Sequence, residues 1–271
     1  MEALAEYVNS RNTGEGLTFK MTNDIDLEGS EQNQWTPIGN NRGITGGPQF
    51  HGTFDGGGYE ISGLYINSPD SGFQGLFGCV GEGGEVRGLG VSGSVMCRGD
   101  AGGVVAWNRV GAAVIDCYNT GLVTGKNSYV GGVVGANDGE IIGCYNAGAV
   151  NAGDDGAGGV AGINSGTVRN SYNTGEIKGN RSVGGVVGID SDHYDGAISG
   201  CYNTGTVEGE YYVGGVVGEN RAIASDCYNT GTVSGGSGVG GVAGSNSGKG
   251  EVIESYNIGS IDGEQDVGGV V

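Results

Sequence analysis

Three short apolar segments recur along the chain in a fixed order. One is the GGV word, which begins at residues 102, 131, 158, 184, 214, 240 and 268. A second leads into Cys-Tyr-Asn and carries one aliphatic column: Val114, Ile141, Val168, Ile198, Ala224 and Val252. A third holds one aliphatic residue between two variable neighbours: Val123, Val150, Ile177, Val207, Val233 and Ile261. This alternation predicts strands with one buried face.

The period predicts how these strands are arranged. The tyrosines that follow Cys or Ser in these repeats are 26 to 30 residues apart, a spacing typical of stacked supersecondary units. The constant apolar residues are β-branched and glycines punctuate each repeat, which favours short strands joined by turns over helical repeats. We therefore expect an all-β, parallel β-solenoid (β-helix) of about nine coils, with three short strands per coil.

The N-terminal residues depart from the repeat. MEALAEYVNS predicts a short amphipathic helix with Leu4, Ala5 and Val8 on one side, and residues 18–27 predict a first strand and turn. Such a helix would cap the open end of the solenoid. We divide the single solenoid into a helical cap (1–16), divergent first coils (17–95) and regular repeats (96–271). Because the chain stops inside a GGVV word, we interpret it as part of a larger parent chain.

The amino-acid composition excludes some classes of binding partner. The chain has 64 Gly and 3 Pro, and its formal charge of −19 comes from 31 acidic and 12 basic residues. This charge repels phosphate backbones and anionic membrane surfaces, so we expect no nucleic-acid partner and no membrane insertion. Many of the glycines and the N-T-G triplets suit turns between strands. We interpret the asparagine column of these triplets as structural, with side chains hydrogen-bonded along the axis.

Several words together resemble a known family. WTPIGN (35–40), FHGTFDGGGYEISGLYI (50–66) and GLFG (75–78), followed by GGVVG and YNTG repeats, resemble the GLUG-motif repeat proteins. The resemblance extends from about Leu17 to Val271. Such repeats occur in large bacterial surface proteins, including adhesins and the non-catalytic parts of some IgA-cleaving metallopeptidases. The resemblance implies a secreted or cell-surface β-solenoid without catalytic residues or cofactors of its own.

The cysteines depart from that family pattern. Cys117, Cys144, Cys201 and Cys227 share one repeat column with Ser171 and Ser255, while Cys79 and Cys97 lie earlier in the chain. A column that accepts Ser requires a small residue and is not a thiolate metal site. In-register neighbours lie within disulfide range, but their parallel side chains disfavour the required dihedral angle. We expect free, buried thiols, with bridged pairs 117/144 and 201/227 as the alternative.

Candidate chemistry is sparse. His51 and His193 lie outside any H-E-x-x-H motif, and no G-x-S-x-G motif occurs. Asp226 and Glu254 occupy one column on adjacent coils and are the best carboxylate pair for a carbohydrate-active β-helix enzyme. Asp190, Asp192 and Asp195 lie in an insertion and loosely resemble a calcium loop, with a solvated acidic loop as the alternative. We expect no enzyme activity.

A tyrosine column is the candidate binding site. It could form an outward stripe that binds sugar rings or an inward ladder that holds the coils together. Its members are Tyr118, Tyr145, Tyr172, Tyr202, Tyr228 and Tyr256. We expect a non-catalytic cell-surface module of an adhesin-like protein that forms or presents a binding surface for a host glycan or protein. The alternatives are a rigid spacer attached to a secreted enzyme and the β-helix enzyme.

Overall fold

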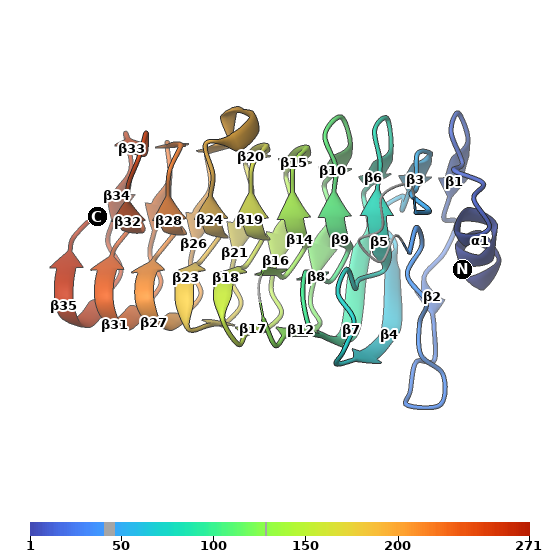
Figure 1. The fold of residues 1–271 in the computed structure, drawn as a ribbon, viewed down its shortest axis with the longest axis horizontal. Helices are drawn as coiled ribbons and strands as arrows, with labels where there is room; N and C mark the ends of the chain where they lie inside the picture. The colour runs from blue at the N-terminus through green and yellow to red at the C-terminus, as the bar shows by residue number, and fades with distance from the viewer. Residues whose placement is uncertain (41–46, 128) are drawn as a thin grey trace.

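The chain is a rod of stacked coils. The computed structural model describes residues 1–40, 47–127 and 129–271, except the side chain of Asp195. Helix α1 (Glu2–Asn9) lies at one end of the rod and the C-terminus at the other (Figure 1). The strands pair in parallel between successive coils, so the predicted parallel β-solenoid is confirmed.

The strands form three sheets that run the length of the rod. The first sheet has nine strands: β1 (Thr18–Lys20), β3 (Thr53–Asp55), β6 (Glu85–Arg87), β10 (Ala113–Ile115), β15 (Glu140–Ile142), β20 (Thr167–Arg169), β25 (Ala197–Ser199), β29 (Ile223–Ser225) and β33 (Glu251–Ile253). The third sheet has seven strands: β5 (Phe77–Val80), β9 (Val105–Asn108), β14 (Val134–Asn137), β19 (Ala161–Asn164), β24 (Val187–Asp190), β28 (Val217–Asn220) and β32 (Ala243–Asn246).

The second sheet is larger because each coil contributes more than one strand to it. Its nineteen strands are β2 (Ile25–Asp26), β4 (Glu60–Ser68), β7 (Gly90–Cys97), β8 (Ala101–Gly102), β11 (Tyr118–Asn119), β12 (Leu122–Gly125), β13 (Val130–Gly131), β16 (Tyr145–Asn146), β17 (Val150–Ala152), β18 (Asp155–Gly158), β21 (Tyr172–Asn173), β22 (Ile177–Lys178), β23 (Arg181–Gly184), β26 (Tyr202–Asn203), β27 (Val207–Gly214), β30 (Tyr228–Asn229), β31 (Val233–Gly240), β34 (Tyr256–Asn257) and β35 (Ile261–Gly268).

The aliphatic columns form the core. Val114, Ile141 and Val168 lie in register on adjacent coils and are fully buried. Val123 and Val150 of the second sheet are likewise in register and buried. The prediction that each of these segments buries one residue between two outward-facing neighbours is therefore confirmed.

Helix α1 covers the first coil, as its sequence predicts. Ala5 and Val8 are buried, and Leu4 packs against the same core cluster. Within the described residues, no helix is long and apolar enough to cross a membrane. The apolar side of α1 is therefore used to close the end of the rod.

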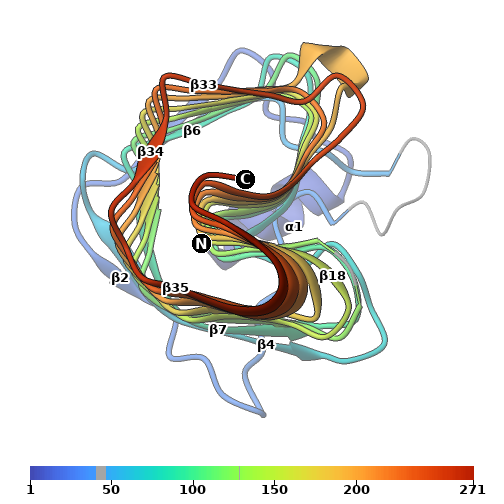
Figure 2. The same cartoon turned by 90° about the vertical axis from the view of Figure 1, so that its left-hand side faces the viewer.

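The GGV word differs from its predicted form. It contains a turn between a strand of the second sheet and one of the third, as between β13 and β14. Seen along the axis, the chain turns inward after β35 to a C-terminus inside the coil (Figure 2). A side chain at Gly162 would overlap the backbone of Tyr129 and Val130. Glycine recurs here because the third sheet lies backbone to backbone against the second.

An asparagine ladder supports the turn that follows each Tyr-Asn pair. Asn119, Asn146, Asn173, Asn203 and Asn229 are buried, and each donates from Nδ2 to Oδ1 of the asparagine in the next coil at 2.7–2.9 Å. The last acceptor is Asn257. Asn146 also exchanges hydrogen bonds with the backbone of Gly148. We call these six residues the first asparagine ladder, and their geometry is that of a structural element.

Candidate functional site

The six tyrosines of the repeat form a continuous stack on the outside of the rod. Ring centroids of successive tyrosines lie 4.8–5.3 Å apart and their planes differ by 2–10°. Each tyrosine is in register with the next, as Tyr145 is with Tyr172. We call Tyr118, Tyr145, Tyr172, Tyr202, Tyr228 and Tyr256 the tyrosine ladder.

The direction of the ladder follows from its neighbours in the chain. Cys144 and Asn146 flank Tyr145 and are both fully buried, so the tyrosine between them points outward. The inner rings are half-buried, whereas Tyr256 at the end of the ladder is 51% exposed. Because stacking covers the ring faces, the inner tyrosines present edges and hydroxyl groups, and Tyr256 presents a free face.

The ring of Tyr118, the first tyrosine of the ladder, packs against Gly90 of the preceding coil. Tyr118 lies in register with Gly90, and a Cβ at Gly90 would overlap the Tyr118 ring. Burial, together with the carboxylates of Glu60 and Asp24, raises the pKa of Tyr118. Burial also raises the pKa values of Tyr145 and Tyr202, with their neighbouring tyrosines adding to the effect. These three tyrosines are therefore neutral phenols at physiological pH.

The cysteine column lies on the inner side of the same segment. Cys117, Cys144, Cys201 and Cys227 are buried and form no disulfide, so the alternative of bridged pairs is not adopted. The amide of Cys117 donates to Sγ of Cys144, and the amide of Cys144 donates to Oγ of Ser171 at 3.1 Å. Burial raises the pKa values of Cys117 and Cys201. The column is a row of small hydrogen-bond acceptors, which explains why Ser replaces Cys there.

The described aspartates of the acidic loop lie in different environments. Asp190 is fully buried at the end of β24, whereas Asp192 is exposed and pairs with Lys249 at 3.5 Å. The side chain of Asp195 lies outside the described residues. Calcium takes six to eight oxygen ligands, and in the described part of the chain no three His, Cys, Asp or Glu side chains are grouped to hold a metal ion. Asp190 and Asp192 therefore have separate environments, and the calcium loop stays a prediction.

The carboxylates considered for catalysis lie at exposed corners. Asp226 and Glu254 have left-handed backbone angles, with φ of 54° and 46°. Both are exposed next to the cysteine column. Their arrangement is that of solvated turn residues.

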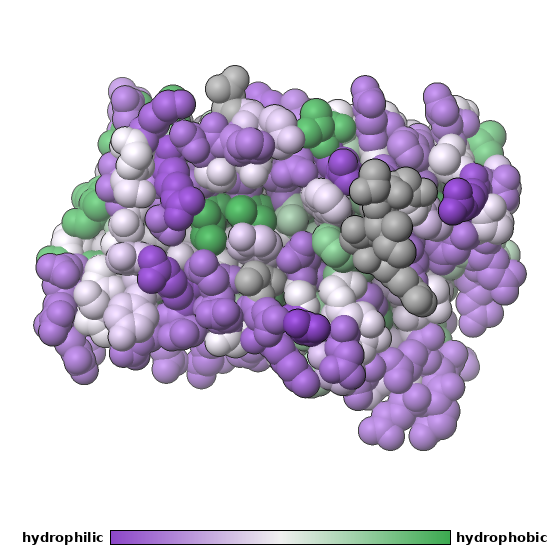
Figure 3. All heavy atoms as spheres, viewed as in Figure 1, coloured by the Kyte–Doolittle hydropathy of each residue, from purple (hydrophilic) through white to green (hydrophobic). Residues whose placement is uncertain are grey.

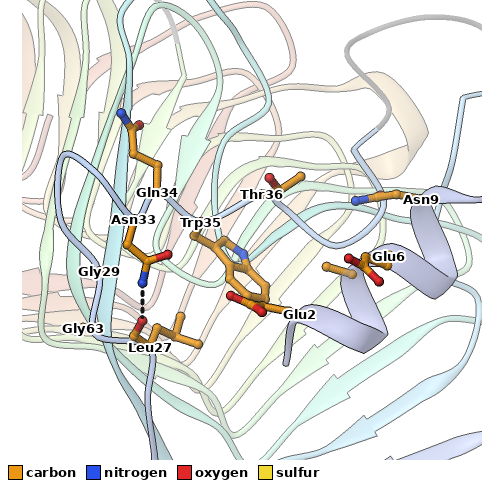
Figure 4. Close-up of a pocket in the computed structure, with 11 residues that line it drawn as sticks. Glu2, Glu6, Asn9, Leu27, Gly29, Asn33, Gln34, Trp35, Thr36 and Gly63 are labelled. Atoms are coloured by element: carbon orange, nitrogen blue, oxygen red, sulfur yellow. Dashed lines mark hydrogen bonds between the residues drawn. The ribbon is translucent and has the colours of Figure 1, made fainter.

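A hollow at the N-terminal end was not found by sequence reasoning. It has a volume of about 490 Å³ and lies between α1 and the segment around Trp35. Glu2, Glu6 and Asn9 enter it from the helix, opposite Asn33 and Trp35 (Figure 4). Trp35 is 8% exposed and its Nε1 donates to the carbonyl of Leu76 at 3.0 Å. Trp35 in the WTPIGN word is the one feature of the sequence that could have indicated this hollow. The other wall of the hollow is formed by α1, which the sequence does not place beside Trp35.

Comparison with known proteins supports the repeat assignment. The model of the GLUG motif matches residues 126–151 and 209–234. The chain carries the GLUG motif. The second matched segment runs from within β27 through the Tyr228 rung of the tyrosine ladder to β31. Two rungs of the ladder, Tyr145 and Tyr228, thus lie within the matched segments.

Two curated relatives share part of the GLUG chain. A "Putative Gly-rich membrane protein" of Evansella cellulosilytica is 40% identical over 97 residues, which cover 34% of this chain and 11% of the relative. "Halomucin" of Haloquadratum walsbyi is 29% identical over 146 residues, 51% of this chain and 2% of the relative. The chain therefore spans a small part of the length of these relatives.

A solved structure has the same fold. It is described as a putative immunoglobulin A1 protease from Bacteroides ovatus, with a TM-score of 0.55 and 18% sequence identity. The match covers 96% of the GLUG chain and 75% of the solved chain. At this level of identity, the likeness concerns the fold alone.

Proposed function

We propose that the GLUG chain is a non-catalytic cell-surface repeat module of an adhesin-like bacterial protein. In this role it forms or presents a binding surface for a host glycan or protein. The observation that carries the proposal is the tyrosine ladder, a continuous outward stripe of phenol groups on a rod. Tyrosine supplies a large, rigid, amphipathic contact surface at low conformational cost.

The surface around the ladder is also suited to a polar ligand. Figure 3 shows the other side of the rod, where the third sheet lies, and that side is mainly hydrophilic with small apolar patches. Thr120, Thr174, Thr204 and Thr230 form an exposed column two residues after the tyrosines. A hydroxyl-rich ligand along the rod would meet tyrosine and threonine hydroxyl groups at the spacing of the coils.

The proposed location is the outside of the cell. The names of the relatives, a membrane protein and a halomucin, support a surface role for the repeats. Free thiols buried in the coils would be protected from oxidants there. The parent protein and its other domains would supply any anchor.

The test is binding of the labelled chain to an array of glycans and host-matrix proteins, with and without calcium. We expect saturable binding to a small set of ligands, weakened by Tyr256→Ala, which removes the free ring face. Tyr211→Ala is the matched control, because Tyr211 is 46% exposed but lies off the ladder. Equal loss in both variants, or no saturable binding, would contradict the proposal.

A rigid spacer attached to a secreted enzyme is the second candidate. The continuous ladders through the coils favour it, because they make a stiff rod without requiring a ligand. A blank array, with the same chain separating two attached domains by a fixed distance, would support the spacer. The carbohydrate-active alternative requires product release from polysaccharides, which Asp226→Asn would abolish.

A further inference from the structure

A second ladder, buried except at its last member Asn246, runs along the rod at the ends of the third-sheet strands. Its members are Asn108, Asn137, Asn164, Asp190, Asn220 and Asn246. Asn108 donates from Nδ2 to Oδ1 of Asn137, Asn137 to Asn164, and Asn220 to Asn246, each at 2.7 Å. An amide suits every rung because it donates on one side and accepts on the other.

One member of this second ladder is a carboxyl group. Asn164 donates to Oδ1 of Asp190 at 2.7 Å, so the ladder continues up to Asp190. Asp190 lies in register with Asn220, and both are fully buried. Oδ2 of Asp190 and Oδ1 of Asn220 have no hydrogen-bond partner among the described residues. Two acceptors therefore occupy adjacent rungs where every other pair has a donor and an acceptor.

We propose that Asp190 is held as a neutral carboxylic acid whose Oδ2–H donates to Oδ1 of Asn220, so that the coils joined at this rung loosen when the proton is lost. A single proton restores the missing donor and satisfies both buried oxygens. Without it, a buried negative charge faces the carbonyl oxygen of an amide, which is costly in a dry interior.

Among the described residues, the Arg and Lys side chains nearest to the contacts of Asp190 pair with other carboxylates. Arg221 pairs with Glu219 at 2.8 Å, and only its backbone amide donates to the carbonyl oxygen of Asp190. Lys249 pairs with Asp192 at 3.5 Å. Two other titratable groups lie near Asp190 in the chain or in space. His193 is exposed on the following loop. The thiol of Cys227 interacts electrostatically with Asp190. Asn164, the preceding member of the ladder, is uncharged, and strand β25 contains no charged residue.

The direction of the pH effect follows from burial. Burial raises the pKa of Asp190 from 3.8 to about 7, and the hydrogen bond from Asn164 offsets only part of this rise. Between these two values the folded chain keeps a proton that the unfolded chain has lost. The equilibrium constant for unfolding therefore rises about tenfold per pH unit in this window and levels off above it. The stabilisation is complete below pH 3.8 and lost above about pH 7.

Asp190→Asn is the decisive variant because asparagine supplies the missing donor permanently. Urea unfolding of the wild type and this variant is measured from pH 4 to pH 9. We expect little difference at pH 4, and at pH 8 an unfolding constant about 100- to 1,000-fold lower in the variant. Asp192→Asn is the matched control: it removes the same charge two residues away, from an exposed side chain.

Two further readouts separate the proposal from its alternatives. The carboxyl carbon of Asp190, followed by NMR, is expected to titrate near pH 7, and titration below pH 5 would overturn the proposal. A wild-type–variant difference that does not change with pH would overturn it as well. If millimolar calcium raised the melting temperature of the wild type at pH 8 but not that of Asp190→Asn, the buried oxygens would hold a cation instead of a proton.

Discussion

Asn146 lies directly below Asn173 inside the rod, and its Nδ2 donates to Oδ1 of Asn173 at 2.9 Å. Asn173 repeats the same bond to Asn203 at 2.8 Å and donates to the carbonyl of Gly175. Its Oδ1 also accepts from the amide of Gly175. Each rung therefore ties two coils and one turn together.

Asn173→Ala is expected to lower the free energy of unfolding by about 2–4 kcal/mol. The change leaves the Nδ2 of Asn146 and the Oδ1 of Asn203 without their ladder partners in a buried place, and each orphaned group costs about 1–3 kcal/mol. Urea denaturation measures the loss. Asn127→Ala is the control, because Asn127 is exposed and outside the ladder; similar losses in both variants would refute the role of the ladder.

Tyr172→Ala is expected to destabilise the rod by about 1–3 kcal/mol, because it removes the two ring stacks on Tyr145 and Tyr202. Tyr172→Phe keeps both stacks and should stay within about 0.5 kcal/mol of the wild type. Thermal unfolding monitored by circular dichroism compares them. Equal destabilisation by Phe and Ala would show that the hydroxyl, and not the stack, is what matters.

Cys144→Ser is expected to change the free energy of unfolding by less than about 1 kcal/mol, because Ser171 already serves as the acceptor in the next coil. Cys144→Ala leaves the amide of Cys117 without its acceptor and should cost about 1–2 kcal/mol. Denaturant titration distinguishes the two. In parallel, a thiol reagent should leave five cysteines of the native chain unmodified and modify all five after unfolding: Cys97, Cys117, Cys144, Cys201 and Cys227.

Gly162→Ala is expected to prevent correct folding or to cost more than about 3 kcal/mol, because its Cβ would overlap the backbone of Tyr129 and Val130, which cannot yield as a side chain can. Gly72→Ala is the control. The nearest atom to a Cβ at Gly72 is 3.8 Å away, so this change should be close to neutral. Soluble yield and melting temperature report both outcomes.

The aliphatic columns made much of the fold predictable. Val123 and its equivalents each stand between variable neighbours, a local pattern that needs no knowledge of distant residues. The same is true of α1, where Ala5 and Val8 mark the buried side. Register between coils then follows from the period.

The turn inside the GGV word was not predictable in this way. Two glycines followed by two valines suit a strand as well as a turn, and the close approach of Gly159 to the Asn173 side chain and the Gly185 carbonyl depends on the stacked coils. The outward direction of Tyr145 also depends on the corner that places Cys144 inside. The hollow beside Trp35 needs α1 to be folded against it, so no single stretch of sequence contains it.

Asp190 shows what an alignment of the coils can add. The residues before and after it in the same column are Asn164 and Asn220. The substitution of one acid in a column of amides is visible in the sequence. The consequence of this substitution can be inferred only when the burial of Asp190 and its register with Asn220 are known. An exposed aspartate in that column would remain an ordinary charged group.

The bonds that join the coils point along the rod, and the two chain ends lie at its opposite ends (Figure 1). A pulling force applied through those ends would open the coils one after another instead of shearing all the strands at once. Each coil of about 27 residues would release roughly 90 Å of extended chain. The molecule would then lengthen in steps under load, and the rungs of its ladders would set the force at which each step occurs.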